Sequence, residues 1–176
     1  MAKEDPAVES VITEAMRQQI GVEGPPALHE VTTSGVRMFA RAVGYDDPVF
    51  YDQAEARRRG YRDLPAPVGY LGTPVFHPAT HDPTFGRPRG AEARVPSPYT
   101  RILNGGNEVE YLSTDICAGD LLTARAKLES LTERYSQALG GAMLIQVTAT
   151  TFINQQGQAV AVMRGTVISY GPKRNS

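Results

Sequence analysis

The stretch Val43-Gly44-Tyr45-Asp46-Asp47-Pro48-Val49-Phe50 stands between two expected helices in the N-terminal half of the chain. Gly44 follows an apolar helical pattern and is expected to end that helix. Asp47 directly precedes Pro48, and this order favours a turn. Asp46 and Asp47 are adjacent, so a pair of carboxylates that face one site is not expected. We therefore interpret the stretch as a turn in which Asp47 steadies the loop.

Two helices flank this turn, and a third is expected at the N-terminus. After a short strand at residues 28–32, Thr33 or Ser34 can cap the helix that ends at Gly44. Its apolar face consists of Val36, Phe39, Ala40 and Val43. Residues 52–55 have the pattern of a capping box, which predicts an Arg-rich helix that stops at Gly60.

The N-terminal helix is predicted from its caps and its spacing. Asp5 can cap it, Pro6 suits its first turn, and Gly21 can end it. Its apolar residues repeat at helical spacing: Val8, Val11, Ile12, Ala15 and Met16. A length of 176 residues predicts one domain. We expect a helical extension at 1–24, the domain at 25–172 and a tail at 173–176.

The C-terminal half is predicted to be β-structure. Strands are expected at residues 107–112, 122–129, 142–154 and 159–170, with turns at 118–120 and 155–158. Helices followed by long antiparallel strands indicate an α+β fold. The prolines between residues 65 and 98 exclude a long helix there, apart from a helical turn near 68–72. We interpret the glycines of residues 104–107 as a bulge or a close backbone approach, not as a phosphate-binding loop.

Composition restricts the function classes. A net charge of −1 argues against nucleic-acid binding. No apolar run reaches the ~18 residues of a membrane span, and no signal core precedes the first helix. A cytoplasmic location is therefore the expectation. The one cysteine, Cys117, is expected to be a buried structural thiol, not a nucleophile.

Five stretches in order resemble the MaoC-like dehydratases, and in particular their FAS1-like N-terminal domain: residues 36–50, 59–67, 105–111, 118–122 and 154–157. The chain is also similar to the non-catalytic subunit of (R)-3-hydroxyacyl-ACP dehydratases. The resemblance implies a hot-dog fold, in which an antiparallel sheet wraps around a central helix. Here that helix should be short, near residues 67–71.

The resemblance also shows what this chain lacks. The family loop reads roughly Gly-Asp-x-Asn-Pro-Leu-His, and its Asp and His act together on one water. Here the Asp position is Tyr45 and the His position is Phe50. Where relatives have Ala-His-Gly at the start of the central helix, this chain has Pro67, which has no N–H to offer an oxyanion. The isolated chain is therefore expected to be inactive.

The expected role is that of a subunit in a heteromeric enoyl-CoA hydratase or 3-hydroxyacyl dehydratase. A MaoC-like partner would supply Asp and His, and this chain would shape a tunnel for a long or bulky acyl-CoA or acyl-ACP. The expected substrate-binding residues are Asp47, Pro48, Tyr61, Pro67, Val68, Arg57, Arg58 and Arg62. The arginines, with Arg59, are either a solvated face or contacts to carrier phosphates.

Alternatives remain open at the level of sequence. A homodimeric hydratase or a thioesterase would use other residues, with His29, His77 and His81 as candidates. Each histidine is more simply interpreted as a surface or hydrogen-bonded residue. No cofactor and no metal are expected, because no third ligand accompanies His77 and His81. A non-catalytic acyl-CoA-binding module is the alternative from another class.

Overall fold

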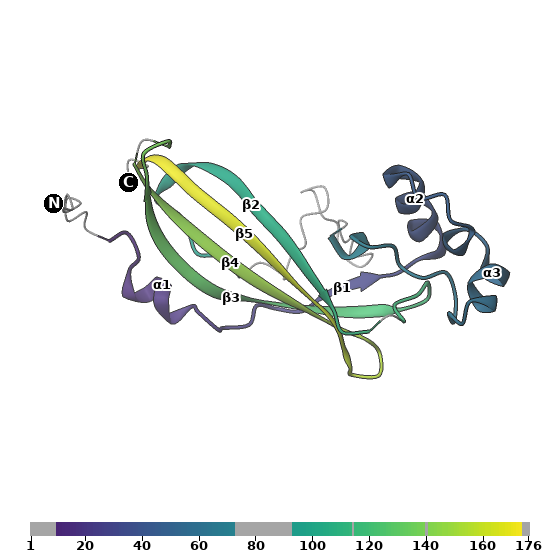
Figure 1. The fold of residues 1–176 in the computed structure, drawn as a ribbon. Coiled ribbons are helices and arrows are strands. Elements are labelled where there is room, and N and C mark those ends of the chain that lie inside the picture. Colours follow the sequence, from purple (N-terminus) through teal and green to yellow (C-terminus); the bar gives the residue numbers. More distant parts are fainter. Residues whose placement is uncertain (1–9, 73–92, 114, 140, 174–176) are drawn as a thin grey trace.

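The sheet dominates the protein (Figure 1). A computed structural model describes residues 10–72, 93–113, 115–139 and 141–173. Within them, five antiparallel strands lie in the order β1-β3-β4-β5-β2. Their bounds are β1 Ala27–Glu30, β2 Tyr99–Tyr111, β3 Leu121–Ser136, β4 Gly141–Ile153 and β5 Ala159–Lys173. The four long strands form a curled sheet, and the expected α+β class is confirmed.

Alternation along the strands determines which face is buried. In β3, Leu122, Ala124, Ala126 and Leu128 are buried, while Arg125 and Lys127 are exposed. This is the period of two that the sequence predicts. β2 begins eight residues before the predicted start at residue 107, and most of its first ten residues are exposed.

Two helices and a 3-10 turn lie beyond one end of the sheet (Figure 1). They are α2 Thr33–Val43, η1 Pro48–Phe50 and α3 Gln53–Arg58. Thr32, not Thr33 or Ser34, caps α2, since its side chain accepts from the Gly35 N–H at 3.0 Å. Gly44 ends α2 with a φ of 82°, as predicted.

The predicted N-terminal helix is wrong in its extent. Residues 1–9, with the expected cap Asp5, lie outside the described residues. The helix that is described, α1 Glu14–Gln18, is capped by Thr13 and buries no side chain. The described part of the expected apolar stripe therefore does not pack into the core, and a capping box at Thr13 and Met16 starts the helix.

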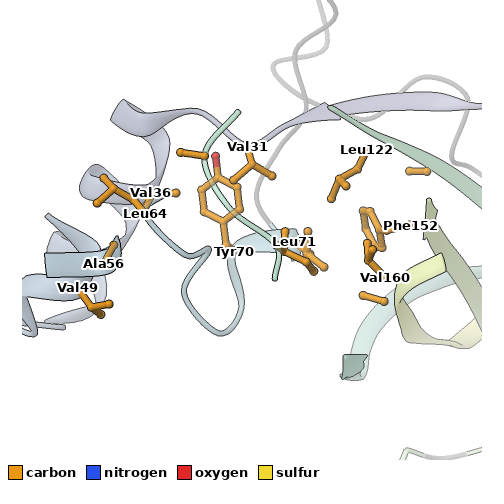
Figure 2. Close-up of a cluster of buried hydrophobic side chains, with 14 of the residues drawn as sticks. Val31, Val36, Val49, Ala56, Leu64, Tyr70, Leu71, Leu122, Phe152 and Val160 are labelled. Carbon is orange, nitrogen blue, oxygen red and sulfur yellow. The ribbon is translucent and has the colours of Figure 1, made fainter. Parts of the chain in front are cut away.

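The core lies where the helices meet the sheet (Figure 2). Leu64, Val36 and Ala56 come from the helical side, and Leu122, Phe152 and Val160 from the strands. Tyr70 and Leu71 stand between the two groups. They belong to η2 Tyr70–Gly72, the short helical element expected near residues 67–71. Residues 73–92 lie outside the described residues.

The two edges of the sheet differ. β3 is covered by β1 and by the segment after α1, whose Gly21 and Gly24 N–H groups donate to Leu128 and Ala126 at 2.8 Å each. β2 forms the other edge, and no strand among the described residues pairs with its outer side. No helix in these ranges is both long and apolar enough to span a membrane.

Candidate functional site

A pocket of about 330 Å³ opens where η1, the segment before η2 and the end of β2 meet. Ten residues line it, and most are apolar or aromatic: Val49, Phe50, Tyr61, Pro65, Ala66, Pro67, Val68, Tyr111, Ser113 and Ile116. Of the residues expected to bind substrate, Tyr61, Pro67 and Val68 line the pocket. Asp47, Pro48 and the arginines do not.

The two positions that the family resemblance assigns to a catalytic pair, Tyr45 and Phe50, hold aromatic rings in this chain. Tyr45 and Phe50 stack with ring centroids 5.6 Å apart and an interplanar angle of 25°. Stacked rings of this kind contribute about 0.5–1.5 kcal/mol beyond their burial. Phe50 lines the pocket and has no proton to exchange. At this position the pocket therefore presents an apolar ring.

The loop that presents Phe50 is fixed by Asp47. The Asp47 carboxylate accepts from the Val49 N–H at 3.0 Å and pairs with Arg59 at 2.9 Å. The backbone hydrogen bond from Val49, together with Arg59, lowers the pKa of Asp47. The predicted turn is confirmed, with Asp47 as the cap of η1.

The segment before η2 offers few free amides. The Ala66 N–H donates to the Ile116 carbonyl at 2.7 Å, and Pro67 has none to donate. The Gly69 N–H donates to the Tyr111 hydroxyl oxygen at 3.1 Å. The amide that follows Val68 in the chain is thus already bound to a side chain that lines the pocket.

The arginines of the α3 region are ion-paired. Arg58 meets Glu55 at 2.6 Å, and Arg57 meets Asp63 at 3.8 Å with 63% of its side chain exposed. Arg62 meets Asp115 at 2.6 Å and the buried Asp120 at 2.8 Å. These acidic partners raise the pKa of Arg62.

The ion pairs of Arg62 also involve the surroundings of Cys117, through Asp120. The buried Asp120 carboxylate accepts from the Cys117 N–H at 2.9 Å and from the Gln155 side chain at 3.0 Å. The Cys117 side chain is fully buried, and burial raises its pKa to about 11. The expectation that Cys117 is buried is confirmed, and burial opposes formation of the thiolate that a nucleophile needs.

His29 differs from its simple interpretation. It is 3% exposed, and its Nδ1 has no hydrogen-bond partner. Its ring meets Tyr70 and Phe152 edge-on, with centroids 5.6 and 5.9 Å away. Burial lowers its pKa. The expectation of a surface or hydrogen-bonded histidine is wrong here, while His77 and His81 lie outside the described residues.

The sequence analysis gave no site role to six of the residues that line the pocket: Val49, Pro65, Ala66, Tyr111, Ser113 and Ile116. Tyr111 ends a stretch that carries the family resemblance, which was an available signal. Its distance of 42 residues from Gly69 gave no indication of their contact.

Comparison with known proteins agrees with this architecture. The family model "FAS1-like, dehydratase domain region" matches residues 18–163. A UPF0336 protein from Streptomyces avermitilis is 31% identical over 116 residues, which is 64% of this chain and 70% of that protein. A probable enoyl-CoA hydratase alpha subunit from Thermomonospora curvata is 26% identical over 79% of this chain, which spans only 44% of that protein.

Two solved complexes from Mycobacterium tuberculosis share the fold. The 3R-hydroxyacyl-ACP dehydratase HadBC aligns with a TM-score of 0.59 at 21% identity, over 86% of this chain and 99% of that one. The ChsH1–ChsH2 complex aligns with a TM-score of 0.67 at 17% identity, over 92% of each chain. The curled antiparallel sheet is thus the expected hot-dog fold. The chain belongs to the FAS1-like dehydratase domain family, among the MaoC-like hot-dog proteins.

Proposed function

We propose that this chain is the non-catalytic subunit of a heteromeric (R)-specific enoyl-CoA hydratase or 3-hydroxyacyl dehydratase. The observation that carries the proposal is the stacked pair of Tyr45 and Phe50 at the two catalytic positions. Hydration of a 2-enoyl thioester requires a base that activates water and an acid that protonates the α-carbon. The phenol of Tyr45 is a poor base for water, and the phenyl ring of Phe50 has no proton to exchange.

The rest of the pocket supports the same proposal. Its described lining contains no carboxylate, imidazole or thiol side chain. His29, the described histidine, is enclosed among Tyr70 and Phe152 and does not line the pocket. What the lining offers is apolar surface, which suits an acyl chain.

The uncovered edge of β2 supports a partner. An exposed strand edge presents N–H and C=O groups that favour pairing with another strand. On this edge, Ile102 is 63% exposed and Leu103 is 40% exposed. HadBC and ChsH1–ChsH2 are themselves complexes. In our proposal a MaoC-like hot-dog partner pairs here and provides the Asp and His.

The carrier of the acyl group is proposed to be coenzyme A or phosphopantetheine. Arg57 is the best placed of the candidate arginines, because its contact with Asp63 is long and its side chain is largely exposed. Arg58 and Arg62 already have closer acidic partners. A carrier phosphate that bound Arg58 or Arg62 would have to share the guanidinium group with these acidic partners.

Co-expression with a MaoC-like protein that has an intact Asp…His loop tests the proposal. Each protein alone and the mixture are assayed for hydration of crotonyl-CoA and of a long-chain enoyl-CoA. We expect co-elution, activity in the mixture, and loss of that activity when the partner's Asp is changed to Asn. The isolated chain is expected to be inactive.

Two outcomes contradict the proposal. Turnover by the purified chain, lost on changing His29, His77 or His81, indicates a homodimeric enzyme that uses other residues. If the two proteins elute separately and their mixture has no activity, the heteromeric enzyme is excluded. Binding of acyl-CoA under those conditions then favours the acyl-CoA-binding module, for which the apolar pocket is already suited.

A further inference from the structure

Tyr111 lines the candidate pocket and carries a hydroxyl group. It is the last residue of β2, and its ring packs against the core while also lining the pocket. The hydroxyl oxygen accepts the Gly69 N–H at 3.1 Å. This contact joins the end of the edge strand to the segment before η2.

The bond leaves the hydroxyl proton available. A phenol has one O–H to donate and two lone pairs that accept. Gly69 uses one lone pair, and among the described residues no acceptor takes the Tyr111 proton. A hydroxyl that already accepts a hydrogen bond is a stronger donor, because bonds in a chain polarise one another.

The surroundings select the kind of acceptor. Lys, Arg and His are all missing from the described lining, so no cation there neutralises an anion. The Ser113 hydroxyl accepts the Asp115 N–H at 3.1 Å. A neutral oxygen attached to an apolar group therefore suits the pocket better than a phosphate or a carboxylate.

We propose that Tyr111 recognises the carbonyl oxygen of an acyl thioester bound in this pocket. The Gly69 N–H donates to the hydroxyl, and the hydroxyl donates to the carbonyl. Tyr111 thereby extends a backbone donor into the pocket, beside a residue, Pro67, that has no N–H of its own. This inference rests on the proposed acyl-thioester function and adds the residue that donates a hydrogen bond to the carbonyl oxygen.

The test compares two probes that differ only at the carbonyl: octanoyl-CoA, a thioester, and S-octyl-CoA, a thioether. Binding is measured by calorimetry on the full chain in the assembly in which it purifies. We expect wild type to bind the thioester about tenfold more tightly, as for one hydrogen bond. Tyr111→Phe should lose this preference and bind the thioether within about twofold of wild type.

Tyr135→Phe is the control, because it also removes a phenol hydroxyl, and Tyr135 is exposed on β3 and does not line the pocket. It should keep the thioester preference. The inference is overturned if Tyr111→Phe keeps the preference, if Tyr135→Phe loses it as well, or if Tyr111→Phe loses both probes alike.

Failure of the function itself gives a different result. If wild type binds both probes equally, acyl binding stands and the role of Tyr111 falls. If wild type binds neither probe, the proposed function falls as well.

Infrared spectra of octanoyl-CoA with a ¹³C-labelled carbonyl give a test without any variant. The bound carbonyl band should move to lower frequency, and an unmoved band overturns the inference.

Discussion

His29 shows most clearly how a single residue affects this fold. Its Nδ1 is buried without a partner, which costs about 1–3 kcal/mol for a neutral polar group. Tyr70 and Phe152 enclose the ring. Because burial lowers the pKa of His29, the folded state holds the neutral ring where the unfolded state takes up a proton.

We predict that His29→Leu stabilises the protein by about 1 kcal/mol at pH 7.5, since it removes the unpaired nitrogen. The pH dependence should change as well. Protonation of His29 in the unfolded state costs the fold nothing above the unfolded pKa of about 6.5, and it lowers stability progressively as pH falls from there toward the lowered folded pKa. Thermal midpoints of wild type and His29→Leu between pH 7.5 and 5.5 should therefore diverge, with the steeper decline in wild type.

His29→Gln separates the two effects. It keeps a polar group in the core but does not titrate, so it should lose the slope without gaining the stability. Parallel slopes in wild type and both variants would show that His29 does not contribute to the pH dependence.

Expectations for single residues were right where neighbouring residues in the sequence determine the structure. They were wrong where burial by residues distant in the sequence determines it. The turn at Asp47 and Pro48 follows from adjacent residues, and the structure confirms it. The resemblance pointed to Tyr45 and Phe50 as replacements of a catalytic pair, but it gave no indication that the two rings stack. The burial of His29 depends on Phe152, which is distant in sequence, and a histidine in a short strand carries no sign of it.

Among the elements, β4 makes a contact that holds the last part of the proline-rich region. Gln146 is 3% exposed, and its amide pairs with both the N–H and the C=O of Val95 at 3.1 Å each. The Gln146 side chain thus pairs with the two backbone groups of Val95 in place of a neighbouring strand. Residues 93–98 are thereby attached to the curled sheet.

Gln146→Leu should lower the free energy of unfolding by about 2–3 kcal/mol, because it leaves two buried backbone groups of Val95 unpaired. Gln156→Leu is the matched control, since Gln156 is exposed in the β4–β5 turn and should change stability by less than about 0.5 kcal/mol. Urea unfolding of both variants measures the difference. Equal midpoints would mean that Val95 finds other partners.

Element boundaries were predictable to different degrees. α2 has an amphipathic face and a glycine stop, and it was predicted within a residue at its cap. The N-terminal helix was overpredicted because spacing alone does not show whether a stripe has a surface to pack on. The start of β2 was missed because its first half is exposed and is interrupted at Gly105, where a Cβ would lie 2.6 Å from Thr166 Cγ2.

At the scale of the whole molecule, the two edges of the sheet are covered to different degrees. β3 has a cover made of β1 and the N-terminal segment, whereas β2 has none among the described residues. The pocket opens beside the end of this same strand, at Tyr111. A partner that pairs along β2 would therefore approach the pocket and its lining residue Phe50 together.

We predict that Ile102→Lys disrupts assembly and leaves the fold intact. Ile102 is 63% exposed on the free edge, and a lysine there opposes strand pairing with a second subunit. Its removal from the exposed surface should change the stability of the isolated chain by less than about 0.5 kcal/mol. Light scattering after size exclusion should show the variant as a monomer at concentrations where wild type elutes as a dimer or with its partner. Val22→Lys is the control: Val22 is 51% exposed in the segment that covers the opposite edge, and this variant should still assemble. Assembly of Ile102→Lys with unchanged affinity would exclude β2 as the interface. The partner's Asp and His would then have to reach the pocket from another side.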